Sequence, residues 1–432
     1  MSDAARKPLR LRLLGDLTTA AEPSTVLRDP YVLTALGALL VFQVLYMVFG
    51  HAPRGISDQM EFEQIGRHFG NWWVLGDAHR TPGYPLYLAI NYKLGLGNTG
   101  AMAGQALLVA VAAGGVGALV GIAGGLVPAR ISAWALAMYI PFFTYSSVML
   151  SDVPSAALSV AGMLCLVLAI RSTELDWRWG TGAAVLLVLA TVVRPIYLAF
   201  LVLALLVLML RAGSWTTRLG LVGVFAVTFA VVFGPYVGRN YVHTRKAQPL
   251  GAQDHLQLTL GLHVPWDNQV GEFSPWDRSV RFFDGKRADG FTPQVAAVAS
   301  PWRILKDDLT KHPADFLWSR VVAQGQLWVW PTTSATQSHV DDFLPYPLIM
   351  AEHLLLLLLG LVAVVRARAH LVGRLVLALT LITMGQYLFL FSTPRYAFAA
   401  SVFLVGMSGI TISWLFERAG RPRVAQAQVP AG

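Results

Sequence analysis

Charge and cysteine are both scarce in this sequence, and each shortage excludes a class of protein. Only 13% of the 432 residues are charged, whereas a soluble domain carries about 25%. The single cysteine, Cys165, lies inside an apolar run, so the chain can form no internal disulfide and no cysteine metal site. The low charge therefore favours a membrane protein over a soluble one.

Two motifs of membrane hydrolases are also missing. The sequence has no G-x-S-x-G segment, which would carry a nucleophilic serine, and no H-E-x-x-H segment, which would bind zinc. Both absences argue against a membrane hydrolase.

Long apolar runs are what the sequence has in abundance. About 20 apolar residues cross the hydrocarbon core of a bilayer as a helix. The runs predict an all-α polytopic membrane protein with about ten spans, in which Arg194 and Pro195 mark the turn between the fifth and the sixth. The predicted spans are 31–50, 101–125, 131–149, 152–170, 178–193, 195–211, 219–238, 348–366, 371–391 and 395–416.

The remaining residues predict loops and surface helices. Segments 58–70 and 83–95 are too short or too polar to span, and we expect them to lie along the membrane surface as amphipathic helices. The predicted organisation is a basic N-terminus (1–30), seven spans (31–238) that include a first outer loop (51–100), a large outer loop (239–347), three further spans (348–416) and a C-terminal tail (417–432).

The distribution of Lys and Arg predicts the orientation of the chain. With the N-terminus in the cytoplasm, the inner segments hold the whole net charge of +9, and the outer side is neutral. The positive charge is therefore a topology signal and indicates no nucleic-acid partner. We expect a multi-pass protein of the inner or plasma membrane, with both termini cytoplasmic and the functional face extracytoplasmic.

Charged residues nevertheless gather at span ends on the predicted outer face. They occur in "SDQMEFEQIGRHFG" and "HRTPGYPLYLA" of the first outer loop, in "MLSDVPSAAL", in the turn "VVRP", in "GPYVGRNYV" and in "PRYAF". Charges that collect at one membrane depth, against the positive-inside bias, point to a site. The candidate residues are Asp58, Glu61, His79, Arg80, Tyr84, Asp152, Arg194, Arg239, Asn240, Arg395 and Tyr396.

Each of these clusters also has a purely structural interpretation. Asp152 can cap a helix, Arg194 and Arg395 can anchor to lipid headgroups, and Asp58 with Glu61 can form a solvated helix face. Convergence favours the functional interpretation, because acids and arginines from separate parts of the chain fall on one face of the membrane.

The residue types indicate the chemistry of such a site. Arginines at the outer interface suit the phosphate of a lipid, and a carboxylate such as Asp58 can accept a proton from a hydroxyl. A second carboxylate, Asp152, can orient the first or, together with it, hold a divalent cation, Mg²⁺ or Mn²⁺. We therefore predict a transferase that acts on a polyprenyl-phosphate-linked donor.

The order of these motifs, together with "HPADFLWSR" late in the large loop, resembles the integral-membrane glycosyltransferases of the GT-C type. In particular it resembles the bacterial branch related to protein O-mannosyltransferases and lipid A aminoarabinose transferases. The resemblance runs from about residue 30 to 415.

This resemblance implies a polyprenyl-phosphate monosaccharide donor, inversion at the anomeric carbon and a lipid, glycan or protein acceptor. It implies that Asp58 acts as the base and that Asp152 serves as support or metal ligand. It also implies that Arg80 and Arg395 contact the donor phosphate, and the placement of charge at the span ends adds Arg194 to them. The remaining candidates would contact the acceptor or support the site.

Two alternatives from other functional classes stay open at this point. A transporter or flippase of lipid-linked sugars would also need arginines for the headgroup, but it should carry ionisable residues near the middle of its spans. A lipid-linked polysaccharide polymerase or ligase would share the large outer loop and the class of donor.

Overall fold

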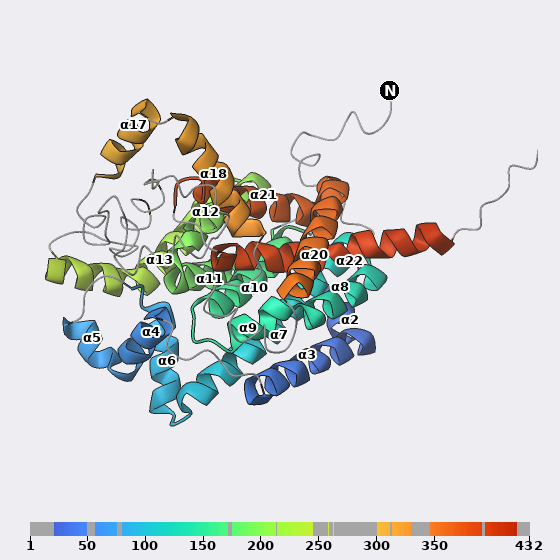
Figure 1. Cartoon of the computed structure of the whole chain (residues 1–432), viewed down its shortest axis with the longest axis horizontal. Coiled ribbons are helices and arrows are strands. Elements are labelled where there is room, and N and C mark those ends of the chain that lie inside the picture. Colours follow the sequence, from blue (N-terminus) through green and yellow to red (C-terminus); the bar gives the residue numbers. More distant parts are fainter. Residues whose placement is uncertain are drawn as a thin grey trace, which may run out of the picture.

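The computed structural model describes residues 21–49, 57–75, 80–171, 175–212, 214–244, 258, 262, 300–311, 313–329, 346–390 and 394–420. These residues form helices and turns, and no strand occurs among them. The predicted fold class is confirmed: this is an all-α polytopic membrane protein (Figure 1).

Within the continuously described stretches of the chain, short connections join successive helices. The α-helices are α2 (Pro23–Arg28), α3 (Pro30–Phe49), α4 (Ser57–Arg67), α5 (Phe69–Leu75), α6 (Gly83–Lys93), α7 (Gly97–Gly124), α8 (Leu126–Met138), α9 (Ile140–Ser146), α10 (Asp152–Arg171), α11 (Trp177–Val193), α12 (Leu198–Arg211), α13 (Trp215–Thr244), α17 (Pro301–Lys311), α18 (Pro313–Trp328), α20 (Tyr346–Arg366), α21 (Leu371–Gln386) and α22 (Phe398–Gly420). Three 3₁₀ turns accompany them, η2 (Pro195–Tyr197), η4 (Ala367–Ala369) and η5 (Pro394–Ala397).

Each of the ten segments that the apolar runs predict as spans is largely helical over its described residues, although the third is broken. Among the described residues, six helices are long and apolar enough to cross a membrane, namely α3, α7, α10, α13, α20 and α22. The apolar helices α11, α12 with η2, and α21 are shorter. The break between the fifth and sixth segments falls at Arg194, as predicted, because its extended backbone ends α11 and Pro195 starts η2.

The third predicted span, residues 131–149, differs from expectation. It consists of α8 and α9, which meet at an angle of 52°. Tyr139 between them has an extended backbone, and Pro141 lies in the first turn of α9. Proline lacks the backbone N–H that would bond to the carbonyl of Ala137, and its ring crowds that carbonyl, so Pro141 favours a break in the turn before it.

Three helices form the centre of the bundle. In the most apolar 18-residue stretch of each helix, the buried share is 72% in α7 and α10 and 78% in α22, against 22% in α3 and α13. Close packing at the centre depends on small residues. A side chain on Gly360 of α20, for example, would collide with the backbone of Leu404 in α22.

The first predicted outer loop folds as three helices. α4 and α5 replace the single expected helix at 58–70, and α6 lies at the expected 83–95. They gather beside the end of α13 (Figure 1). α17 and α18 belong to the second predicted loop, and α18 packs against the turn after α21, where Leu327, Tyr387 and Ala397 share one apolar cluster.

Candidate functional site

Asp58, in the first turn of α4, is held by two arginines. Arg80 Nη2 donates to Asp58 Oδ1 at 2.6 Å, and Arg395 Nη2 donates to Asp58 Oδ2. Arg80 Nη2 also donates to Glu61 Oε2 at 2.5 Å, one helical turn along α4. The structure therefore joins two parts of the first predicted loop to the start of the last span.

The charges in this cluster stabilise one another. Burial by itself would raise the pKa of Asp58, but the Arg395 and Arg80 guanidiniums outweigh it and hold that pKa below its usual value. Burial would lower the pKa of Arg80, but Glu61 and Asp58 raise it overall. Asp58 and Arg80 are therefore both charged at neutral pH.

Arg80 is fixed by contacts on several sides. Its guanidinium lies over the Phe62 ring, 4.8 Å from the centroid, and its backbone carbonyl accepts a hydrogen bond from Tyr236 Oη at 3.0 Å. The chain then turns into α6 at Gly83, whose Cα approaches α11 so closely that an added Cβ would lie 2.8 Å from backbone atoms of Val192. Glycine is needed there because no side chain fits.

A second ion pair forms between Asp152, the first residue of α10, and Arg194, at the break after α11. Arg194 Nη1 donates to Asp152 Oδ1, and only 1% of the Asp152 side chain is exposed. Arg194 and Arg395 both lie against the Tyr396 ring, 5.0 and 5.3 Å from its centroid. Tyr396 thus connects the two ion-paired groups.

A pocket of about 710 Å³ opens between these groups and the helices α12 and α21. It has two parts. The first, which we call the head, is formed by Arg80, Arg194 and Arg395 with Phe62, Thr81, Ser151 and Tyr396. The second, the apolar limb, is lined by Leu198, Ala199, Val202, Leu203, Leu206, Ile382 and Leu390.

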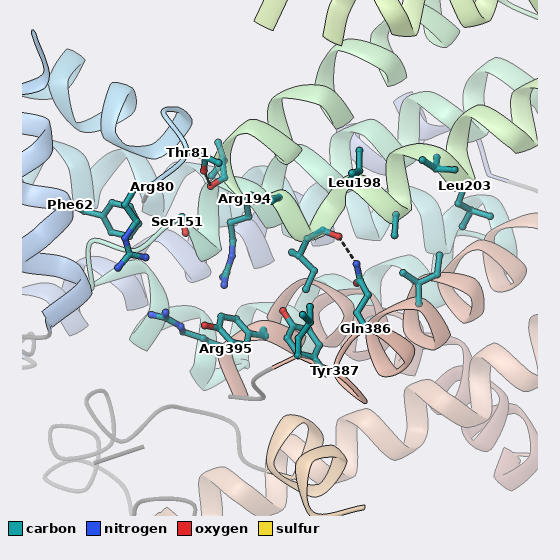
Figure 2. Close-up of a pocket in the computed structure, with 18 of the residues that line it drawn as sticks. Phe62, Arg80, Thr81, Ser151, Arg194, Leu198, Leu203, Gln386, Tyr387 and Arg395 are labelled. Carbon is teal, nitrogen blue, oxygen red and sulfur yellow. Dashed lines mark hydrogen bonds between the residues drawn. The ribbon is translucent and has the colours of Figure 1, made fainter. Parts of the chain in front are cut away.

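Figure 2 shows the labelled arginines at one end of the pocket and Leu198 and Leu203 at the other. Among the described residues that line the pocket, none is acidic. The carboxylates Asp58, Glu61 and Asp152 bind the arginines without being part of the wall. The head therefore presents guanidiniums to whatever enters the pocket, and such groups bind phosphate well.

The candidate Tyr84 supports the site without lining the pocket. Its hydroxyl donates to Gln105 Oε1 at 2.8 Å, and its ring packs edge-on against Phe62 at 4.9 Å. Gln105 in turn donates to the carbonyls of Ser146 and Val148, at 3.0 and 2.8 Å. This chain of contacts connects α4 and α6 to the segment that leads to Asp152.

The candidates Arg239 and Asn240, near the end of α13, lie outside the pocket lining. Arg239 donates to the carbonyls of Trp72 and Trp73, at 2.7 and 2.8 Å, and to Asn240 Oδ1 at 2.9 Å. Arg239 therefore ties α13 to α5. The remaining candidate, His79, lies outside the described residues.

The two aspartates as arranged do not form a site for a divalent cation. Both oxygens of Asp58 accept from guanidiniums, and Asp152 Oδ1 accepts from Arg194. In the described part of the chain, no three His, Cys, Asp or Glu side chains come together as metal ligands.

Several buried polar residues were missed by the sequence reasoning. Arg320 of α18 donates to the carbonyl of Leu388 at 2.8 Å, and His353 of α20 contacts both Tyr139 Oη, at 2.8 Å, and the carbonyl of Trp328, at 3.0 Å. A signal existed for Gln105 and His353, since an isolated polar residue inside an apolar run is costly unless it has partners. No such signal marked Tyr236, because tyrosine is common at membrane interfaces.

No protein-family model matches this sequence, and no curated protein matches it. Among solved structures, the chain is similar to the oligosaccharyltransferase of Archaeoglobus fulgidus in the apo form, with a TM-score of 0.48 and 14% sequence identity. The alignment covers 92% of this chain and 52% of that protein, so this chain spans about half of its length. A likeness of this size identifies no activity, and the resemblance of the motifs to GT-C glycosyltransferases stays a prediction.

Proposed function

We propose that this protein is a membrane glycosyltransferase that moves a monosaccharide from a polyprenyl phosphate to an acceptor hydroxyl. The observation that carries the proposal is the two-part pocket, in which three arginines lie at one end of an apolar limb. An amphiphile with an anionic head and a hydrocarbon tail matches this arrangement, and a polyprenyl-phosphate sugar is such a molecule.

The apolar limb supports a lipid in place of a small soluble anion. Val202 and Leu206 line the limb and are also 49% and 52% exposed, so α12 carries this part of the pocket to the surface of the bundle. On a membrane protein that surface faces lipid. The volume of about 710 Å³ lies within the range of roughly 300–1,000 Å³ for ligand sites. It suits a headgroup and the first prenyl units, with the rest of the chain in the bilayer.

The head supports bond breaking at the anomeric carbon. The acceptor oxygen forms a bond to that carbon while the bond from the carbon to the phosphate oxygen breaks with inversion. The phosphodiester, with one negative charge, becomes a phosphate monoester with two. Preorganised guanidiniums stabilise this growing charge most in the transition state, which is where stabilisation raises the rate.

Asp58 is the proposed base, because it is the carboxylate bound to both Arg80 and Arg395, which would hold the phosphate, and its side chain is 21% exposed. It would take the proton of the acceptor hydroxyl as the new bond forms. Asp152 would keep Arg194 in place, since removing one member of a buried pair leaves an unpaired charge. The acceptor would be a hydroxyl of a lipid, a glycan or a protein.

The proposed location follows from the distribution of basic residues. We place the protein in an inner or plasma membrane with both termini in the cytoplasm and the pocket head at the extracytoplasmic surface. Sugars delivered there would modify the cell envelope.

The proposal is tested with purified protein in lipid nanodiscs. A panel of polyprenyl-phosphate monosaccharides is supplied with mixed lipid, glycan and peptide acceptors, and released polyprenyl phosphate is quantified by mass spectrometry. We expect release from at least one donor. If no donor reacts while all of them bind, the proposed glycosyltransferase activity is wrong. A flipping assay in proteoliposomes then tests the transporter.

A further inference from the structure

Every arginine of the pocket head is paired with a carboxylate that lies outside the pocket lining. Asp58 binds Arg80 and Arg395, Glu61 binds Arg80, and Asp152 binds Arg194. Three carboxylates thus balance three guanidiniums, and the head carries no net charge from these six groups. An anion that enters the pocket therefore meets guanidiniums whose charge the carboxylates already balance, through Nη2 of Arg80 and Arg395 and Nη1 of Arg194.

The Asp58 pairs are the ones that a phosphate group would imitate most closely. The two oxygens of Asp58 bridge Arg80, which precedes α6, and Arg395, which lies in η5. Both arginines line the pocket. A phosphate group can bridge two guanidiniums in the same way, because its oxygens match the spacing of the N–H donors as carboxylate oxygens do. The Asp58 side chain is 21% exposed, whereas that of Asp152 is 1% exposed. Asp58 therefore has more room to move than Asp152.

We infer that Asp58 and the lipid phosphate compete for the Arg80 and Arg395 guanidiniums, so that binding of the phosphate releases the Asp58 carboxylate. This inference rests on the proposed function for the identity of the ligand, a prenyl phosphate.

The exchange resolves a conflict in the chemistry of Asp58. While the carboxylate is bound to both arginines its pKa is held low, and a weak base accepts protons poorly. When the phosphate takes over the guanidiniums, burial acts on the carboxylate with less opposition, and its pKa rises. The donor thereby activates the base, and the reaction acquires an order in which the donor binds before the proton is removed.

Competition also has a cost in affinity. Suppose that a ligand binds only when Asp58 has dissociated from the arginines. Its apparent affinity is then its intrinsic affinity multiplied by the fraction of protein in that dissociated state. Removing the charge of Asp58 should therefore improve the binding of the phosphate. The opposite sign follows if Asp58 helps to hold the ligand, either directly or through a bridging cation.

The test measures the dissociation constant of a prenyl monophosphate in nanodiscs, with no sugar and no acceptor. We expect Asp58→Asn to tighten binding about tenfold, the order of magnitude of a lost charge-assisted hydrogen bond. Glu61→Gln should tighten it less, because Glu61 contacts Arg80 and its side chain is 35% exposed. Asp29→Asn is the matched control, since Asp29 pairs with Arg130, which lies outside the pocket lining. Asp29→Asn should leave the dissociation constant of the prenyl monophosphate unchanged.

The prenyl alcohol serves as a second control for the apolar limb, and none of the three variants should change its binding. Unchanged or weaker phosphate binding by Asp58→Asn overturns the competition. If Asp58→Asn does not fold, Glu61→Gln decides by the sign of its effect. A wild-type protein that binds alcohol and phosphate equally well would instead defeat the proposed donor class, so the two failures are distinguishable.

Discussion

Asp29 and Asp58 are both carboxylates at the beginning of a helix, and both are held by arginine. Asp29 accepts from Arg130 Nη2 at 2.6 Å and also from the backbone amides of Tyr31 and Val32, at 3.0 and 3.3 Å. Arg130 lies over the Tyr31 ring at 4.6 Å and is 34% exposed. This pair caps α3 and joins it to α8.

Asp58 differs in what its arginines face. Arg80 and Arg395 line a cavity of about 710 Å³ that continues into an apolar limb. The comparison teaches that an ion pair by itself says little about function. A pair becomes a candidate site when its cations also form the wall of a space that a ligand can enter.

The substitution with the largest expected effect is Asp58→Asn. We expect it to abolish sugar transfer, because the amide cannot accept the proton of the acceptor hydroxyl. The release of polyprenyl phosphate from the donor measures this effect. Asp29→Asn removes the equivalent charge from the other pair and should leave transfer unchanged. Equal rates for Asp58→Asn and the wild type would remove the distinction between the two aspartates.

Substituting the arginine partners of Asp58 and of Asp29 tests the same difference between the two aspartates. Arg80→Ala and Arg395→Ala should each lower the rate of transfer about 100-fold or more, the usual effect of removing one group that stabilises transition-state charge. Arg130→Ala removes the partner of Asp29 and should affect only thermal stability. The rates are measured at saturating donor, with the melting temperature of each variant recorded. A large loss of transfer in Arg130→Ala would mean that the α3 cap is coupled to the site.

The Asp152–Arg194 pair lies between the two cases, because it is buried and Arg194 also lines the pocket. Asp152→Asn should destabilise the protein by about 3–5 kcal/mol and reduce transfer strongly, since Arg194 loses its buried partner. Adding Arg194→Gln should restore part of the stability but not the transfer. Recovery of both by the double variant would assign this pair a purely structural role.

The smallest expected effect concerns the apolar limb. Leu203→Trp should fill part of the limb and weaken the binding of prenyl phosphate about tenfold, or about 1.4 kcal/mol, because the indole occupies space that the prenyl chain needs. Leu210→Trp is the matched control, because Leu210 lies on the same helix, is 60% exposed and is not part of the lining. Dissociation constants in nanodiscs compare the two. Equal effects would place the lipid elsewhere on α12.

Much of the fold could be predicted because long apolar runs permit few structures in a bilayer other than helices. The turn at Arg194 was predictable from a charge followed by proline. The bend at Tyr139 was not, because "MYIPFF" reads as continuous apolar sequence and only Pro141 interrupts it.

The candidate site could be predicted in part. Charge at the ends of outer spans identified Asp58, Arg80, Asp152, Arg194 and Arg395, and the structure places all five at the pocket head or directly behind it. The pairing itself was beyond the sequence, because Asp58 and Arg395 are 337 residues apart and no local pattern links them. The roles of Tyr236 and Gln105 depend on helix packing, which charge patterns do not describe.

Gly83 also bears on how this pocket could diversify during evolution. A side chain there would press on the main chain of Val192, so position 83 tolerates almost no substitution. Arg80 and Arg194 flank that contact and would be displaced together. We therefore expect descendants that accept a different sugar to vary at lining positions away from Gly83, such as Tyr387, which packs against a side chain and not against main chain. Among such descendants, the residues beside Gly83 should stay the same, and the residues on the other side of the pocket should vary.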